Sequence, residues 1–179
     1  MKRFTLLTLL LGFCATLQAQ TVMVGGEAMY PKKDIVSNAV NSADHTTLVA
    51  AVKAAGLVET LQGEGPFTVF APVNDAFENL PEGTVEALLK PEAKAKLQAV
   101  LTYHVIPGVL DFKALKAKIV EGKGKAVLTT VQGAKLTFMM NGEHNILVKD
   151  AQGNVANITV YNVYQKNGVI QVIDSVLMP

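Results

Sequence analysis

The sequence predicts an α+β domain with a helix-rich N-terminal half and a strand-rich C-terminal half. Apolar residues recur at helical spacing in the first half, as Leu48, Val52 and Ala55 do. After Gly108, short β-branched and aromatic runs alternate with amide–glycine pairs, which supply the positive φ of tight turns. Because helices and strands are segregated along the chain, the pattern favours α+β over an alternating α/β fold.

The N-terminus has the pattern of an export signal. Two basic residues precede an uncharged apolar run over residues 4–17, and the small Ala19 follows. This run is shorter than the ~20 residues of a spanning helix. It predicts a signal peptide over residues 1–19, cleaved before Gln20, and therefore a secreted, periplasmic or cell-surface protein. A buried N-terminal helix and a retained anchor are the alternatives.

Composition limits the function of the mature chain. Cleavage leaves 160 of the 179 residues, enough for one domain. It removes the single cysteine, Cys14, so no disulfide is expected; Phe13 before it argues against a lipoprotein. The formal charge changes from +1 to −1 as Lys2 and Arg3 leave. Such a chain, without another long apolar run, is not expected to bind nucleic acid or to span a membrane.

Residues 20–33 show no sustained period and are predicted to be a linker or N-terminal arm, so the domain is placed at residues 34–179. Helical patterns follow from Ile35 and from Leu48, and Gly56 suits the left-handed residue that ends the second helix.

Residues 65–77, GPFTVFAPVNDAF, predict a strand, a sharp exit and a capped helix. FTVF is β-branched and aromatic, and Pro72 cannot donate to a sheet. Asn74 or Asp75 then caps the helix, and Asp75 with Glu78 has the spacing of a capping box.

Downstream, Thr84 is a predicted cap and Pro91 suits the first position of a helix whose apolar stripe covers residues 93–101. That helix must end before Pro107, which places Tyr103 and His104 at a helix-to-strand corner. One helical turn is expected over residues 111–115, followed by a charged loop over 121–125. Strands are expected over residues 126–130, 136–140, 146–148, 155–163 in part and 169–173.

Residues 65–77 and Tyr103–Gly108, YHVIPG, resemble the two signature motifs of the fasciclin domain family. Residues 48–61 resemble its leading helix and residues 167–179 its closing strand, so the resemblance spans residues 35–179. It implies a β-wedge of about seven strands with helices packed on it. Residues given an architectural role in these motifs are Thr68, Phe70, Pro72, Asn74, Asp75, Phe77, Pro107, Gly108, Asn167, Gly168 and Asp174.

The resemblance also implies a function: a secreted or surface-displayed adhesion module, here similar to single-domain bacterial members, with no established catalytic centre. The family's Tyr-His pair, linked to receptor binding in animal members, corresponds to Tyr103 and His104. Two positions depart from the pattern: Gln171 stands where His is frequent, and Asn162 where Asp is common.

Each candidate site also has an architectural interpretation. A buried His104 at the corner is expected to bond a backbone carbonyl, and Tyr103 to be a half-buried anchor whose hydroxyl finds a partner. If Leu136 and Phe138 face the core, Met139 faces outward as a possible contact. The triplet at Asn157 fits N-glycosylation, a short and common pattern.

No catalytic or metal site is predicted. His45 and His144 lack zinc-ligand spacing, and capping explains the carboxylate pair of Asp75 and Glu78. No nucleophile elbow surrounds Ser37, Ser42 or Ser175.

The leading hypothesis is therefore a non-enzymatic extracytoplasmic adhesion module, without cofactor, that binds an extracellular protein of the matrix, a surface polysaccharide or another cell. A lipid or small-molecule carrier, or a weak hydrolase, that uses a cleft between wedge and helices is the alternative.

Overall fold

The computed structural model describes residues 21–179, so the predicted signal peptide lies outside the described residues. The helices are α1 (Ile35–Ala39), α2 (Thr46–Ala55), α3 (Val58–Gln62), α4 (Asn74–Glu78), α5 (Thr84–Leu89), α6 (Lys94–Tyr103) and α7 (Phe112–Glu121). The strands are β1 (Val22–Val24), β2 (Glu27–Met29), β3 (Phe67–Pro72), β4 (Val105–Pro107), β5 (Lys125–Thr129), β6 (Lys135–Asn141), β7 (Asn145–Lys149), β8 (Val155–Gln165) and β9 (Gly168–Ile173).

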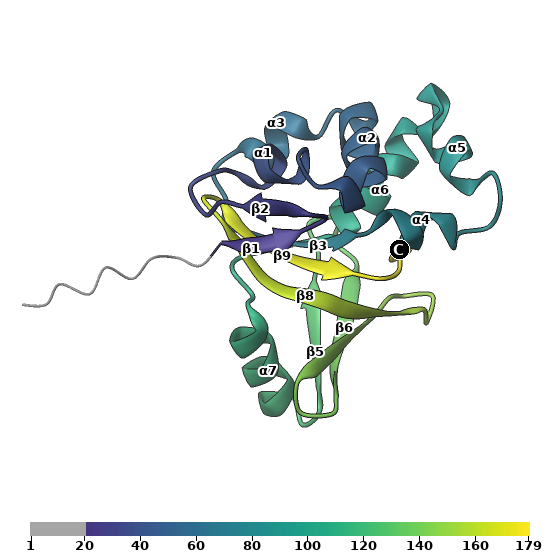
Figure 1. Cartoon of the computed structure of the whole chain (residues 1–179). Helices are drawn as coiled ribbons and strands as arrows, with labels where there is room; N and C mark the ends of the chain where they lie inside the picture. Colours follow the sequence, from purple (N-terminus) through teal and green to yellow (C-terminus); the bar gives the residue numbers. More distant parts are fainter. Residues whose placement is uncertain (1–20) are drawn as a thin grey trace, which may run out of the picture.

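A seven-stranded sheet in the order β4-β3-β9-β8-β7-β6-β5 organises the domain (Figure 1). Only β3 and β9 pair in parallel, from Phe67 opposite Gly168 to Pro72 opposite Ile173. Helices α1 to α6 gather at one end of the sheet, and α7 lies beside β5 at the other (Figure 1). The predicted mixed α+β wedge of about seven strands is confirmed.

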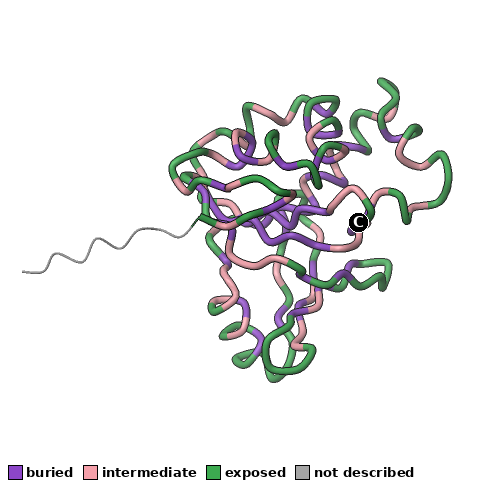
Figure 2. The backbone as a smooth tube through the Cα atoms, viewed as in Figure 1, coloured by how far each residue is buried: buried purple, intermediate pink, exposed green. Residues whose placement is uncertain are grey.

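Two large apolar clusters fill the interior. Figure 2 shows the buried residues concentrated in the middle of the domain and the exposed ones in its outer loops. One cluster joins the helical end to the sheet and contains Leu48, Ala55 and Val172. The other lies between the sheet and α7, where the rings of Phe70 and Phe138 are 5.2 Å apart. Burial of these side chains is the main force that holds the helices on the sheet. In the described part of the chain, no helix is both long and apolar enough to cross a membrane.

Residues 21–33, which the sequence indicated as a linker or arm, form a hairpin packed on the domain. Strands β1 and β2 pair from Val22 opposite Met29 to Val24 opposite Glu27. Val24 and Met29 are buried in the first cluster, and the amide of Asn38 bonds the backbone of Tyr30. The prediction was wrong because two buried side chains in a three-residue strand pair leave no periodic pattern.

The predicted cap of α4 is also wrong. The cap residue is Val73, and no side chain caps this helix. Asn74 instead accepts the Thr47 N–H at 3.1 Å and donates to the Ala43 carbonyl at 2.8 Å, so it caps the start of α2. Asp75 is exposed in the first turn, where a carboxylate suits the helix dipole without a bond.

Three smaller expectations need correction. Helix α7 runs to Glu121, well past the single turn predicted, because Leu115 and Ile119 are both buried in the second cluster. The Asp111 carboxylate caps its start through the Ala114 N–H at 2.8 Å. Thr84 is the first residue of α5 rather than its cap, which is Gly83. Gly168, which with Asn167 forms one of the amide–glycine pairs expected to supply a positive φ, has no positive φ; it is glycine because a Cβ there would collide with the carbonyl oxygen of Phe67.

Candidate functional site

Tyr103 and His104 lie inside the domain, at the corner between α6 and β4. His104 is 3% exposed; its Nδ1–H donates to the Val100 carbonyl at 2.8 Å, and its Nε2 accepts the Leu177 N–H at 3.0 Å. The expected buried histidine bonded to a backbone carbonyl is confirmed. Burial lowers the pKa of His104 from 6.5 to about 4, so the ring is neutral at physiological pH.

Tyr103 is more deeply buried than predicted, at 0% exposure. Its hydroxyl donates to the Lys135 carbonyl at 2.9 Å and accepts the Ala151 N–H at 2.9 Å. The side chains of Tyr103 and His104 thus join α6 to β6 and to the C-terminal segment. Their role in receptor binding stays a prediction, and any such role would act through the position of neighbouring surface residues.

The signature motifs meet at one end of the sheet. The Thr68 hydroxyl donates to the Gly108 carbonyl at 2.7 Å and accepts the Leu110 N–H at 2.8 Å, which ties β3 to the chain after β4. The Gly108 N–H donates to the Pro66 carbonyl at 2.8 Å. A β-branched side chain in one motif therefore fixes the glycine turn of the other.

Asn167 connects this end to the helices. Its side chain accepts the Ile35 N–H at 3.1 Å and donates to the carbonyls of Leu61 at 2.8 Å and Gly63 at 3.0 Å. Every hydrogen-bonding direction of the amide but one lone pair is used, so the loops at residues 62–66 and 165–168 are held in one arrangement. At the other end of β9, Asp174 accepts the backbone and side-chain N–H groups of Asn157 at 2.8 and 2.7 Å.

An open cleft of about 520 Å³ lies over these loops, lined by residues 62–66, residues 164–168, Asp34 and Val109. We call it the Tyr164 cleft. The Tyr164 ring is 42% exposed, and its hydroxyl donates to Asp111 Oδ2 at 3.0 Å. Partial burial and the bond to Asp111 raise the pKa of this phenol, which stays protonated.

Sequence reasoning missed the groups that line this cleft. Gln62, Glu64 and Lys166 are exposed, and their side chains make no hydrogen bond or ion pair with residues 21–179. Tyr164 alternates with the buried Val163 and Gln165 on β8, so the period of two was a usable signal for an outward ring.

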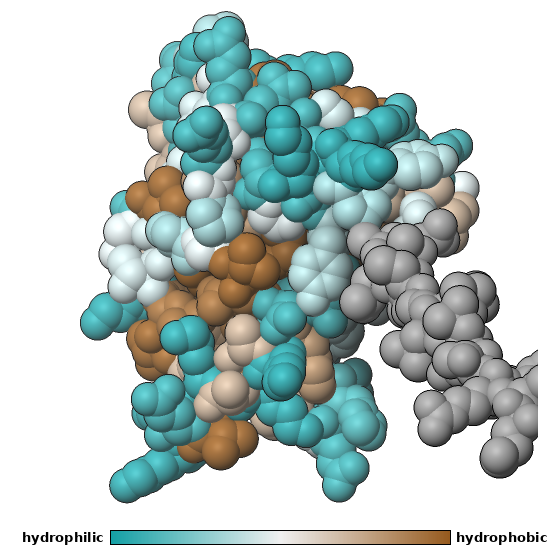
Figure 3. Space-filling view, turned by 90° about the vertical axis from the view of Figure 1, so that its left-hand side faces the viewer, coloured by the Kyte–Doolittle hydropathy of each residue, from teal (hydrophilic) through white to brown (hydrophobic). Residues whose placement is uncertain are grey.

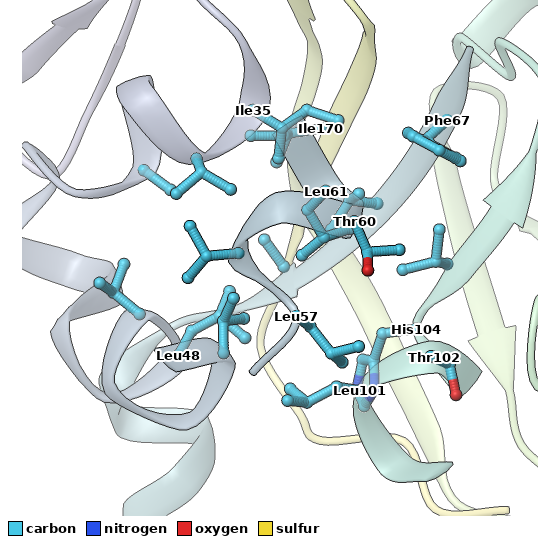
Figure 4. A pocket seen from close by; sticks show the side chains of 18 of the residues that line it. Ile35, Leu48, Leu57, Thr60, Leu61, Phe67, Leu101, Thr102, His104 and Ile170 are labelled. Carbon is cyan, nitrogen blue, oxygen red and sulfur yellow. The ribbon is translucent and has the colours of Figure 1, made fainter. Parts of the chain in front are cut away.

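A second, apolar cavity of about 70 Å³ lies between the helical end and the sheet (Figure 4). Apolar side chains from α1 to α3 face those of β3 and β9 across it, among them Ile35, Leu48, Leu57, Leu61, Phe67 and Ile170. His104 borders it, but both ring nitrogens already have partners. Thr102 uses its hydroxyl on the Gln98 carbonyl at 2.7 Å.

The surface of the domain is uneven in polarity. On the face shown in Figure 3, a group of hydrophobic residues interrupts a largely hydrophilic surface. Met139, the contact predicted on β6, is partly buried rather than fully exposed. Its role in binding stays a prediction.

A serine and a histidine come into contact at one place in the described part of the chain, where Ser42 Oγ is 2.8 Å from His45 Nδ1. Both residues are buried, and the adjoining space of about 10 Å³ admits at most one water. Burial lowers the pKa of His45, and its Nε2 has no hydrogen-bond partner. Within residues 21–179, no three His, Cys, Asp or Glu side chains gather as a metal site would require.

The fold and its motif contacts define a mixed α+β domain in which sequence motifs from three parts of the chain fix one end of a single sheet. The chain belongs to the fasciclin domain family: residues 43–179 match the Fasciclin domain. A solved FAS1 domain pair from the insect cell adhesion molecule fasciclin I superposes with a TM-score of 0.71 at 18% identity. The match covers 83% of this chain and 52% of that one, and it shows the fold.

Curated relatives are similar to this chain over most of its length. Protein sll1483 of Synechocystis sp. is 49% identical over 81% of this chain and 73% of its own length. The cell surface glycolipoprotein MPB83 of Mycobacterium bovis is 36% identical over 93% of this chain and 70% of its own length. Human periostin is 31% identical over 75% of this chain but only 14% of periostin.

Proposed function

We propose that this chain is an exported, non-enzymatic module of the cell-adhesion type that binds an extracellular protein or polysaccharide through the Tyr164 cleft. The observation that carries the proposal is the contrast within this cleft: its base is fixed by Asn167 and Thr68, while Gln62, Glu64 and Lys166 keep their polar groups available. A preorganised base with unpaired polar groups lowers the ordering cost of binding a ligand. The names of MPB83, a cell surface glycolipoprotein, and of fasciclin I, an insect cell adhesion molecule, support the class.

The test is adhesion of the mature chain to immobilised whole cells, extracellular matrix and purified surface glycans. The variant Glu64→Ala with Lys166→Ala removes one charge of each sign from the cleft. Its matched control, Glu82→Ala with Lys90→Ala, makes the same change at exposed positions beside α5. We expect retention to fall for the cleft variant alone. Equal retention of both variants, at equal stability, would refute the cleft as the binding site.

Export is part of the proposal. We expect the protein from its native source to begin at Gln20 or within a few residues of it, because Ala19 follows an uncharged apolar run. Intact-mass measurement of the protein outside the cytoplasm checks this. A soluble cytoplasmic pool that retains residues 1–19 would contradict it.

The apolar cavity favours a second candidate, a carrier of small apolar molecules. Its volume of about 70 Å³ is roughly half of the ~150 Å³ that holds benzene in an engineered core cavity, so it suits a short alkyl group better than a whole lipid. Native mass spectrometry after purification, with and without added hexane, tests it. We expect that filling the cavity by Ala39→Leu removes any apolar adduct, while adhesion through the cleft persists.

A further inference from the structure

Resting on the proposed function, we infer that the ligand of the Tyr164 cleft is a neutral sugar ring, stacked on Tyr164 and hydrogen-bonded by Gln62, Glu64 and Lys166. The ring of Tyr164 is held at a fixed angle, because its hydroxyl bonds Asp111 Oδ2 while Asp111 Oδ1 caps α7. An exposed aromatic face that needs no ordering on binding suits the apolar C–H face of a pyranose.

The polar groups match the hydroxyls of such a ring. Gln62 offers both a donor and an acceptor, Glu64 only acceptors and Lys166 only donors. A sugar hydroxyl is both donor and acceptor, so it bonds any of the three. The volume of about 520 Å³ lies within the ~300–1,000 Å³ typical of small-molecule sites.

The charges in the cleft favour a neutral ligand over an acidic one. Glu64 and Lys166 offset each other. Asp34 accepts the Ser37 N–H at 2.8 Å on one carboxylate oxygen and the Ser37 hydroxyl at 2.6 Å on the other, so it adds negative charge to the cleft with about half of its acceptor sites already used. An anionic glycan would meet two carboxylates and one ammonium. A protein anchor would in turn require a larger apolar lining than Val109 and Pro66 provide.

The experiment is an NMR titration of the ¹⁵N-labelled mature chain with cellotetraose, maltotetraose and chitotriose, and separately with a heparin tetrasaccharide and a collagen-type peptide. We expect at least one neutral oligosaccharide to shift amides in residues 62–64 and 164–168. Tyr164→Ala should weaken its binding about tenfold or more, the loss typical of an aromatic anchor. Tyr164→Phe keeps the ring and should stay within about threefold of the parent.

The control Tyr30→Ala removes another exposed tyrosine, 50% accessible and outside the cleft, and should leave the affinity unchanged. Thermal melts must show that Tyr164→Ala is folded. If no neutral sugar shifts the cleft, or if only heparin or the peptide does, the inference fails. If adhesion still depends on Glu64 and Lys166, the proposed function stands although the sugar inference has failed. If adhesion does not depend on them either, both the inference and the proposed function are refuted.

Discussion

Asn162 on β8 and Gln171 on β9 hold each other by two hydrogen bonds: the Asn162 N–H donates to Gln171 Oε1 at 3.0 Å, and Gln171 Nε2 donates to Asn162 Oδ1 at 3.3 Å. These are the two positions at which the sequence departs from the family's Asp and His. Asn162 has a φ of 60°, and its Oδ1 also accepts the Phe112 N–H at 2.7 Å. Two neutral amides thus act together at the positions where the resemblance implied Asp and His.

This pairing predicts non-additive substitutions. Gln171 is fully buried, so Gln171→His alone should be destabilising, and so should Asn162→Asp. The double variant should be less destabilised than the sum by about 0.5–3 kcal/mol, since the new groups can pair. Urea melts at pH 7 measure all three. Strict additivity would show that the two positions are independent.

Two substitutions at Asn162 distinguish the cost of backbone strain from the cost of a lost hydrogen bond. Asn162→Ala loses the acceptor for the Phe112 N–H and replaces asparagine, which tolerates a φ of 60°, with alanine, which tolerates it poorly, at an expected cost of about 2–4 kcal/mol. Asn162→Gly loses only the acceptor and should cost less. Chemical denaturation compares them, and equal losses would mean that the φ of 60° carries no strain.

Asn74 is expected to act on α2 although it lies in α4. Asn74→Ala should cost about 0.5–2 kcal/mol, because the Thr47 N–H loses its acceptor. Asp75→Ala, its neighbour and control, should stay within about 0.5 kcal/mol of the parent. Hydrogen exchange of the first turn of α2 should accelerate only for Asn74→Ala. The reverse order of stabilities would restore Asp75 as the cap.

The lowered pKa of His104 predicts that the free energy of unfolding depends on pH. Its pKa is about 4 in the folded domain against 6.5 ordinarily, so the unfolded chain binds the extra proton between these values. Stability is therefore full above pH ~6.5 and falls as the pH drops towards ~4, by about 3 kcal/mol in total. His45, whose pKa burial also lowers, acts in the same direction.

His104→Gln should lower stability at pH 7 but flatten its decline below pH 6.5, while His45→Gln should leave the larger part of the decline in place. Denaturant midpoints from pH 4 to 8 report this. An unchanged slope in His104→Gln would assign the titration to other groups.

Short-range patterns in the sequence predicted much of the fold of this protein. Patterns among residues a few positions apart predicted four features of the fold. These are the α+β class, the strand at residues 67–70, the left-handed Gly56 that ends α2, and the bonded histidine at the α6–β4 corner. Such features depend on side-chain period, on proline and glycine, and on bonds within one turn, so a sequence displays them directly.

Tertiary structure alone decided which distant groups meet. Asn74 resembles a local cap, yet it bonds Thr47 from another helix, and Asn167 resembles a turn residue, yet it accepts the N–H of Ile35, 132 positions away. Packing decides which unsatisfied backbone group lies near a polar side chain, and the side chain bonds that group. In a buried place this bond must form, because an unpaired polar group there is costly. The Tyr164 cleft arises in the same way: Gln62, Glu64 and Lys166 come together only because β3 and β9 pair in parallel.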